Sequence, residues 1–507
     1  MNHPENALPA GGPAKLAQNP VKVYEILPKD RLVLLFTAVF CVLLADTLLW
    51  HGPTAGLTAA VFAWYALVLY ITGPTPLMVR SNRALLLFNL FLAVTLALGS
   101  NWYFRLWNLM ALLMLLPVHA LALSGGVRLP WWRPAMLWER FWLLLRGLFG
   151  HLGAVPAALA PGEKSRVSRR VVPVVLGCFG AALLVALLVP VLASADALFA
   201  AVTEDLRAFL RAHFTTALQK LVWGLALTPF LFGFLYSLRH PKPLRDSPAK
   251  RTAADSLVFV LVLASLDLLY VCFLAVQSAG LFGGAEYLAQ RGISYAEWAR
   301  SGFFQMVGVT AVNLTVTMTA LTASRREGRA WTVLRLLAAL LCLESLVLLA
   351  SAAWRMTLYV TAYGLSFKRC MTYWGMVMMA LFLLAALWKV RRPGFSYCRL
   401  AFPLALAGWL VINCVPVDGL VAKNQVDRYL NGDSATVSVH YLAYSLSYDT
   451  LSQLERLDSG LSLAALEGDW WGRDETLGDL LEQRRDAARA ECADWHTWSL
   501  SACLAAG

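Results

Sequence analysis

The stretch LVLLFTAVFCVLLADTLLW, residues 32–50, is the first apolar block of the chain. A helix of about 20 apolar residues spans the roughly 30 Å hydrocarbon core of a bilayer, and this block has about that length. Residues 1–31 before it are polar, and no small-residue cleavage site follows it. Residues 32–50 therefore predict a retained membrane span and not a secretory signal.

Similar apolar blocks recur along most of the sequence. Hydrophobic residues make up 59% of the chain and charged residues 15%, whereas soluble domains carry about 25% charged residues. Helices are the expected spanning structure, because every backbone amide in lipid must be bonded within its own segment. We predict an all-α polytopic helical membrane bundle of about eleven spans. The predicted spans are residues 32–50, 55–72, 84–100, 105–123, 171–193, 216–238, 256–279, 302–323, 331–353, 371–388 and 400–416.

The chain divides into three regions. Residues 1–31 are a polar N-terminal segment, residues 32–416 are the transmembrane domain, and residues 417–507 are an acidic tail. Within the second region, residues 130–152 interleave tryptophan with arginine, which is typical of an amphipathic helix in the headgroup layer. Leucines recur at helical spacing in the tail, so we expect a small helical domain outside the membrane.

The basic residues predict the orientation of the chain. Lysine and arginine cluster in alternate loops, such as residues 164–170, 239–251, 325–329 and 389–392, and basic loops remain cytoplasmic. The N-terminus is therefore predicted inside and the tail outside. The net charge of +12 is explained by contact of these loops with anionic lipids of the bilayer, and no nucleic-acid partner is predicted.

The cysteines predict neither a disulfide framework nor a metal site. The nine cysteines are scattered, and most of them lie in apolar blocks without a CxxC pair. Cys492 and Cys503 are the only pair in the tail, and nothing in their spacing demands a bond. We expect them to remain unbonded, and we predict no metal and no cofactor.

The common catalytic motifs are absent from the sequence. It has no GxxxxGK[ST] phosphate loop, no HExxH and no GxSxG, and its histidines are far apart along the chain. Membrane enzymes often assemble a site from single distant residues, so these absences leave the question of enzymatic activity open.

Two acids are predicted to lie inside the membrane. Asp267 falls near the middle of the seventh span and Glu344 falls in the ninth. A charge at that depth costs roughly 2.5–3.5 kcal/mol, so such residues face the bundle interior, pair or stay protonated. They are candidates for a proton or cation relay. The alternative is that each bonds to a neighbouring polar side chain, such as Asn313, Thr315 or Thr317. Asp46, near the outer end of the first span, reaches the interface and needs no special role.

Four polar and aromatic stretches at the ends of spans are predicted to lie on the outer side. They are residues 192–199, 292–304, 355–366 and 417–429. Glu297 and Arg300 would share one face of a helix. Three roles for these stretches are possible. They form a shared site on the outer face, they form the surface on which the tail docks, or they are an aromatic belt at the membrane interface with helix-capping residues. The candidate cluster comprises Asp196, Tyr295, Glu297, Arg300, Arg355, Tyr359, Asp427 and Arg428.

The same stretches resemble a bacterial family of multi-spanning membrane proteins catalogued as a domain of unknown function, DUF4173. The similar motifs are Ser194-Ala195-Asp196 with Phe199, residues 294–304, residues 355–366, residues 418–429 and the closing residues 494–501. Ser294, Trp298 and Ser366 depart from the family pattern. The resemblance implies a bacterial inner (plasma) membrane and the same helix layout, but no activity.

Three functions are compatible with these observations. The first is a non-enzymatic membrane protein, either transporter-like or an envelope scaffold that presents the acidic tail. The second is a membrane enzyme that acts on an envelope or lipid-linked substrate at the outer face, with Glu297 or Asp196 as acid or base and Arg300 and Arg355 holding an anionic headgroup. The third is a sensor or assembly partner that binds another envelope protein through residues 417–507.

Overall fold

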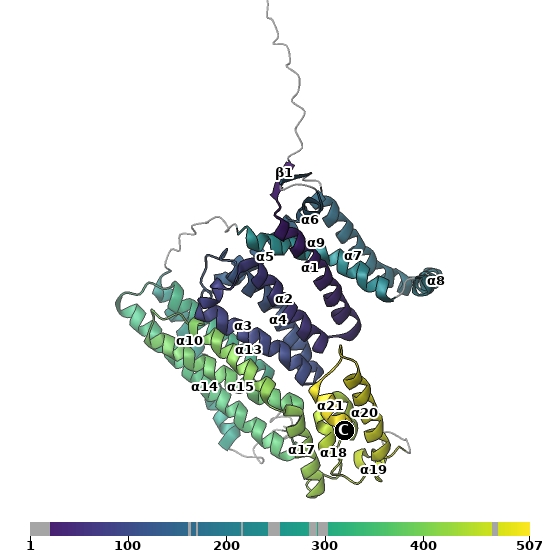
Figure 1. The fold of residues 1–507 in the computed structure, drawn as a ribbon. Coiled ribbons are helices and arrows are strands. Elements are labelled where there is room, and N and C mark those ends of the chain that lie inside the picture. The colour runs from purple at the N-terminus through teal and green to yellow at the C-terminus, as the bar shows by residue number, and fades with distance from the viewer. Residues whose placement is uncertain are drawn as a thin grey trace, which may run out of the picture.

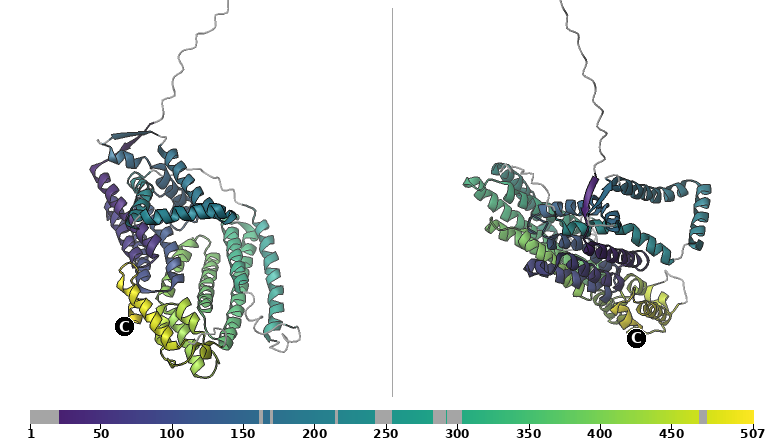
Figure 2. Two further views of the ribbon diagram at one scale, coloured as in Figure 1. Left: turned by 90° about the vertical axis from the view of Figure 1, so that its right-hand side faces the viewer. Right: turned by 45° about the horizontal axis from the view of Figure 1, so that its top comes forward.

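Long helices dominate the computed structural model, which describes residues 21–160, 164–168, 171–213, 216–241, 254–282, 292, 303–468 and 475–507. The helices run alongside one another, with strand β1 at one end and the tail at the other (Figures 1 and 2). We call the end that contacts residues 417–507 the tail face. The all-α fold class is confirmed by these elements.

The first half of the bundle is built around one apolar core. It comprises α1 (Pro28–Asp46), α2 (Ala55–Thr72), α3 (Arg80–Leu98), α4 (Trp102–Leu123), α5 (Ala135–Gly150), α6 (Ala154–Leu159) and α9 (Thr216–Arg239). Trp64, Leu92, Leu112 and Phe232 belong to this core and are at least 95% buried. Side chains of α2, α3, α4 and α9 therefore interlock, which holds α9 beside helices from much earlier in the chain.

Helices α1 and α9 pack closely because of one glycine. A Cβ atom added at Gly224 of α9 would lie 2.6 Å from Cα and 2.7 Å from the backbone nitrogen of Val42 in α1. At the opposite end of α1, Asp30 forms an ion pair with Arg239 of α9 and accepts a 2.8 Å hydrogen bond from the Leu27 amide. The two helices are thus fixed at both ends of their contact.

The second half of the bundle contains the longest helix. Its members are α10 (Ser256–Phe282), α13 (Phe303–Ala323), α14 (Gly328–Tyr363), α15 (Phe367–Arg391) and α16 (Cys398–Cys414). Two apolar clusters along α14 hold α10, α13 and α15 against it. Helices α7 (Val171–Ala195) and α8 (Ala197–His213) project to one side of the bundle (Figures 1 and 2).

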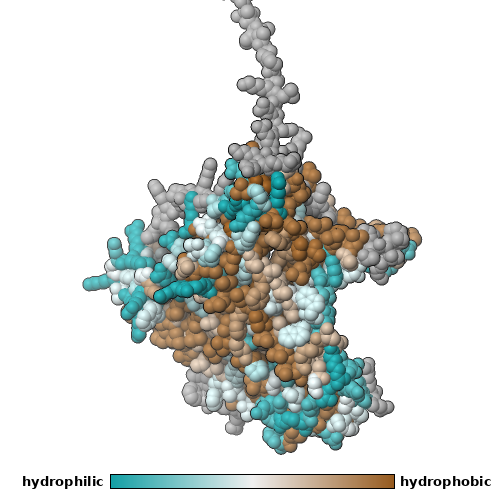
Figure 3. Space-filling model, in the orientation of Figure 1, coloured by the Kyte–Doolittle hydropathy of each residue, from teal (hydrophilic) through white to brown (hydrophobic). Residues whose placement is uncertain are grey.

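The predicted number of spans is not confirmed. Each of the eleven predicted windows falls on a helix, but within the described residues only eight helices are long and apolar enough to cross a membrane. A ninth span results if α16 and the following α17 (Val417–Leu430), which are bent by 49°, are counted together. Within α13, the segment Gly308–Ala323 qualifies only as a shorter apolar helix. Large apolar side chains are exposed along the spans, and apolar surface covers the middle of the molecule in Figure 3. Such a surface fits a lipid environment, so the protein is integral to a membrane.

The N-terminal segment carries a strand that the sequence analysis did not predict. β1 (Val21–Glu25) pairs antiparallel with β2 (Lys164–Ser168), with Val23 opposite Arg166. Tyr24 is 2% exposed and packs edge-on against Tyr236 of α9. This strand pair caps the end of the bundle opposite the tail face.

The tail is a small helical unit with its own core. After α17 it contains turns at Tyr441–Ser445 and Tyr448–Thr450, then α18 (Leu451–Leu454), α19 (Leu463–Glu467), α20 (Leu477–Ala493) and α21 (Leu500–Ala506). Val421, Leu442, Leu454, Leu466 and Leu480 are fully buried or nearly so in this core. The leucine spacing in the sequence therefore predicted its apolar face correctly.

The expectation of unbonded tail cysteines is wrong. Cys492 at the end of α20 and Cys503 in α21 form a disulfide, with their Cα atoms 5.3 Å apart. The two helices pack against each other, and this tertiary contact brings the thiols together. Sequence spacing alone carries no such information.

Candidate functional site

The tail covers the helix ends at the tail face. The amide of Gly56, at the start of α2, donates to the carbonyl of His496 (3.1 Å), and the amide of Tyr448 donates to Oγ of Ser100, between α3 and α4 (3.0 Å). Arg105 of α4 pairs with Glu491 of α20 at 3.0 Å. Helices α2 and α4 and the loop between α3 and α4 are therefore fastened to the tail by polar contacts.

Helix α17 closes the end of α14. The last carbonyls of a helix lack partners within it, and basic side chains can satisfy them. Arg428 donates to the carbonyls of Thr361 (2.7 Å) and Ala362 (2.9 Å). Asn424 Oδ1 accepts from the amide of Leu365 at 2.7 Å, just after Gly364 turns the chain at φ 74°. The stretches 355–366 and 417–429 thus meet as a docking surface.

Asp418 is the buried polar centre of this contact. It is 3% exposed, and its Oδ2 accepts from Asn101 Nδ2 (2.7 Å) and from the amide of Ser447 (3.0 Å). Asn101 also caps α4, because its Oδ1 accepts from the amides of Tyr103 and Phe104. One carboxylate thereby joins a helix cap of the bundle to the tail.

A cavity of about 380 Å³ lies beside Asp418 at the ends of α3, α4 and α16. Its lining includes Thr95 and Asn413. Both belong to a network inside the bundle in which Asn108 donates to Thr95 Oγ1 (2.9 Å) and to Asn413 Oδ1 (2.7 Å), and accepts from Trp409 Nε1 (2.8 Å). The cavity therefore joins the tail face to buried polar side chains.

The described members of the predicted outer-face cluster do not form one group. Asp427 pairs with Arg456 of the tail at 2.7 Å, and the Arg369 guanidinium lies 4.3 Å from the ring centre of Tyr359. Arg355 is buried on α14. Asp196 caps α8 by accepting from the Phe199 amide at 2.7 Å. Tyr295, Glu297 and Arg300 lie outside the described residues.

The two intramembrane acids lie together. Asp267 on α10 and Glu344 on α14 are 3% and 5% exposed, and they lie near each other where α10 packs against α14. Within the described residues, none of their four buried carboxyl oxygens has a hydrogen-bond partner. Asn313, one of the expected partners, instead bonds to Ser345 (2.9 Å) and Tyr270 (3.0 Å). The structure therefore places two buried acids near each other, without hydrogen bonds to the polar side chains that were expected as their partners.

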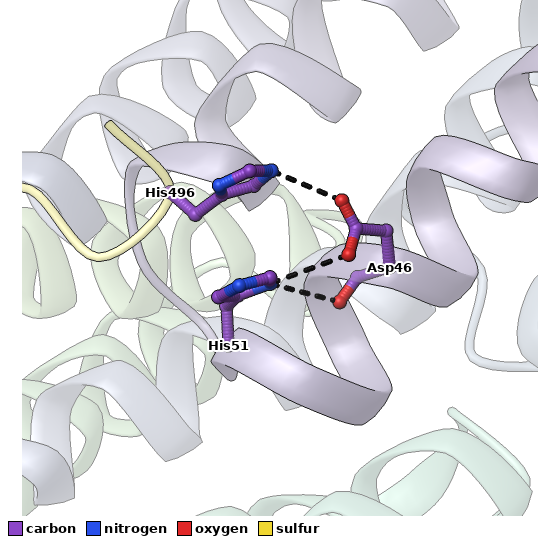
Figure 4. Close-up of side chains that lie close together, drawn as sticks. All are labelled: Asp46, His51 and His496. Carbon is purple, nitrogen blue, oxygen red and sulfur yellow. Dashed lines mark hydrogen bonds and ion pairs between the residues drawn. The ribbon is translucent and has the colours of Figure 1, made fainter. Parts of the chain in front are cut away.

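A second ionisable group lies where the tail meets the hairpin formed by α1, residues 47–54 and α2, which we call the first hairpin (Figure 4). Asp46 at the end of α1 contacts His496 Nε2 through Oδ2 (3.0 Å), and its Oδ1 contacts His51 Nδ1 (3.4 Å) and Lys220 Nζ of α9 (2.6 Å). The two imidazole rings are stacked, with centres 4.1 Å apart and planes 7° apart. Asp46 thus joins three segments, contrary to the expectation that it needs no special role.

The sequence offered a partial signal for this group. Asp46 and His51 are five residues apart at the end of a span, and His496 lies in the closing stretch that carries the family resemblance. Nothing in the sequence indicates that the two segments touch.

The His496 ring and backbone amide also bond to Asp494 (3.0 and 2.9 Å), and these bonds lower the pKa of the Asp494 carboxyl.

Comparison with known families gives one match. A family model described as "Domain of unknown function (DUF4153)" matches residues 86–457, more than half of the chain. The motifs correctly indicated a family of unknown function, although its number is DUF4153 and not DUF4173. No curated protein and no solved structure gives a significant match.

Proposed function

Because the chain belongs to the DUF4153 family, whose description assigns no activity, we propose its function from the structure: a transporter-like membrane protein that carries a proton or a cation on an intramembrane pair of acids. The observation that carries this proposal is the proximity of Asp267 and Glu344, which are buried without hydrogen-bond partners on two packed membrane-spanning helices. Ionisable residues at such depth are rare, and they mark ion pathways and proton relays.

The chemistry of the pair follows from its surroundings. Two adjacent carboxylates repel each other, and each is costly to ionise away from water. A pair that shares one proton lowers both costs, because the protonated group donates a hydrogen bond to the other. The pair then carries a single negative charge. Uptake of a second proton or of a monovalent cation neutralises it, and release restores it.

The cavity at the tail face, which is lined by both polar and apolar side chains, supports the same function. Transport requires water or cargo to enter the bundle, and the cavity beside Asp418 extends to Thr95 and Asn413 inside it. Neither a scaffold nor a sensor needs a polar entrance of this kind. The outer-face enzyme is the weaker alternative, because Asp196 and Arg355, the described members of its site, lie on separate elements and have different surroundings.

Infrared spectroscopy of the protein in lipid tests the proton-sharing pair. At neutral pH the wild type should show the C=O stretch of a protonated carboxyl, and the Asp267→Asn/Glu344→Gln double variant should lose it. Asp255→Asn, at the exposed start of α10, is the matched control and should keep the band. A double variant with the wild-type spectrum would contradict the proposal.

The membrane orientation completes the proposal. The N-terminus is placed in the cytoplasm and the tail outside, in the inner membrane of a bacterium, with anionic lipids at the basic loops. The basic helix ends at Arg239 and Arg391 belong to the end opposite the tail face. The Cys492–Cys503 disulfide also supports this placement, because disulfides persist in oxidising compartments.

Labelling of single thiols in intact cells tests the orientation. Ala435 in the tail and Glu327 between α13 and α14 are both exposed, so each is replaced by cysteine in a background without other free thiols. A membrane-impermeant maleimide should label Ala435→Cys in intact cells and Glu327→Cys only after permeabilisation. The reverse pattern would invert the orientation.

A further inference from the structure

We propose that Asp46, His51 and His496 bind a divalent transition metal ion such as Zn²⁺, which fastens the tail to the first helical hairpin. One ligand atom from each residue lies within 4.8 Å of the other two (Figure 4). Zn²⁺ accepts imidazole nitrogen and carboxylate oxygen, and it occupies sites with three protein ligands and one open position. This site is separate from the Asp267–Glu344 pair and does not depend on it.

The distances from the two histidine nitrogens to the Asp46 carboxylate, one to each of its oxygens, are close to those between ligand atoms around a bound ion. His496 Nε2 is 3.0 Å from Asp46 Oδ2, and His51 Nδ1 is 3.4 Å from Asp46 Oδ1. Metal–ligand bonds of about 2.0–2.1 Å in a tetrahedron place ligand atoms roughly 3.3 Å apart. His51 Nδ1 also lies 3.2 Å from the main-chain oxygen of Asp46, a contact that it gives up when it binds the ion. Small rotations of the side chains therefore complete the site.

The Asp494 carboxylate contacts the far ring nitrogen of the ligand His496, as outer carboxylates do in known metal sites. Histidine ligands usually donate their second ring N–H to a carboxylate or carbonyl, which fixes the tautomer and orients the ring. His496 Nδ1 lies 3.0 Å from Asp494 Oδ1, and its Nε2 faces Asp46. Asp494 thus orients the ring so that Nε2 is the nitrogen that faces Asp46 and would bind the ion.

The local charge favours a cation. Asp46 and Asp494 contribute two negative charges, and Lys220 contributes one positive charge at 2.6 Å from Asp46 Oδ1. With both histidines neutral, this group carries one net negative charge. Lys220 holds Oδ1, while Oδ2 faces His496, so the lysine orients the ligating carboxylate as outer partners do.

The three ligands come from two segments that are far apart in the sequence, so a bound ion would have a structural role. Asp46 and His51 belong to the first hairpin, whereas His496 belongs to the loop between α20 and α21. The hairpin holds this loop through the carbonyl of His496, which accepts from Thr54 Oγ1 (2.5 Å) and the Gly56 amide (3.1 Å). An ion bound across this contact stabilises only the docked tail, because ligand binding favours the state that contains the complete site.

Calorimetric titration of the purified, EDTA-treated full chain with ZnCl₂ tests the site. The wild type should bind one Zn²⁺ per chain, and bound Zn²⁺ should raise its unfolding temperature. His496→Ala should lose both effects. Asp494→Asn leaves all three ligands in place and should weaken binding by about 10–100-fold.

His440→Ala is the matched control, because His440 is an exposed histidine of the same tail; it should bind Zn²⁺ as the wild type does. Equal binding by the wild type and His496→Ala would show that Zn²⁺ binds elsewhere. Absence of binding in the wild type would show that the cluster is held by hydrogen bonds and ion pairs alone. Either result overturns the proposal. An unchanged affinity in Asp494→Asn would remove the role of Asp494.

Discussion

Replacing Gly224 by alanine is expected to lower the free energy of unfolding by about 1–3 kcal/mol, the usual cost of inserting a methyl group into a packed core. The new Cβ would lie 2.6 Å from Cα and 2.7 Å from the backbone nitrogen of Val42. Backbone atoms cannot rotate away as a side chain can, so α1 and α9 must separate. Their separation loosens the core formed by α1, α2 and α9. Thermal unfolding in detergent, monitored by circular dichroism, measures the loss.

Gly180→Ala is the matched control for this prediction. Gly180 also lies inside a long apolar helix, α7, but an added Cβ there meets nothing within 4 Å. Alanine is the better helix former, so this variant should unfold at the wild-type temperature or slightly above it. Equal losses in both variants would show that the close contact of α1 with α9 does not contribute to stability.

Composition predicted the helices well because lipid restricts the choice of backbone structure. Every apolar block of about 20 residues became a helix. The number of spans was harder to predict, since α16 continues after a bend into α17, with Pro416 between them. The residues after Pro416 are polar enough to resemble a tail. Hydropathy alone does not show where such a bent helix leaves the membrane.

The features that the sequence analysis missed all depend on contacts between distant segments. β1 pairs with β2, which lies more than a hundred residues later. The Cys492–Cys503 bond needs α20 to pack on α21. The Asp46 group needs the last loop of the chain to dock on the first hairpin. Local propensity contains no information on such pairings. The sequence shows whether each residue is polar or apolar, but it does not show which distant residue it contacts.

The two intramembrane acids are a further example of a proximity that the local sequence does not reveal. The depth of Asp267 and Glu344 in the bilayer followed from their positions in apolar blocks. Their proximity to each other did not, because it depends on the rotation of α10 and α14 about their axes. The expected alternative named Asn313, Thr315 and Thr317 as partners, but Thr315 bonds to the carbonyl of Ala311 in its own helix.

Glu344→Gln is expected to abolish proton or cation movement through the protein. The glutamine side chain keeps the size and the hydrogen-bonding capacity of glutamic acid but cannot gain or lose a proton. The remaining Asp267 then loses the partner with which it shares a proton, and the pair no longer cycles between its charged and neutral states. Glu344→Asp keeps a carboxyl group and should retain part of the activity. Asp255→Asn, outside the membrane, should match the wild type.

Proton flux into proteoliposomes tests this account most directly. Vesicles containing the purified protein and a pH-sensitive dye are placed under an imposed pH gradient, with and without external monovalent cations. The account predicts that wild-type vesicles change their internal pH faster than protein-free vesicles, and that Glu344→Gln reduces the rate to the protein-free leak. It is contradicted if Glu344→Gln conducts as fast as the wild type, or if wild-type vesicles conduct no faster than protein-free vesicles.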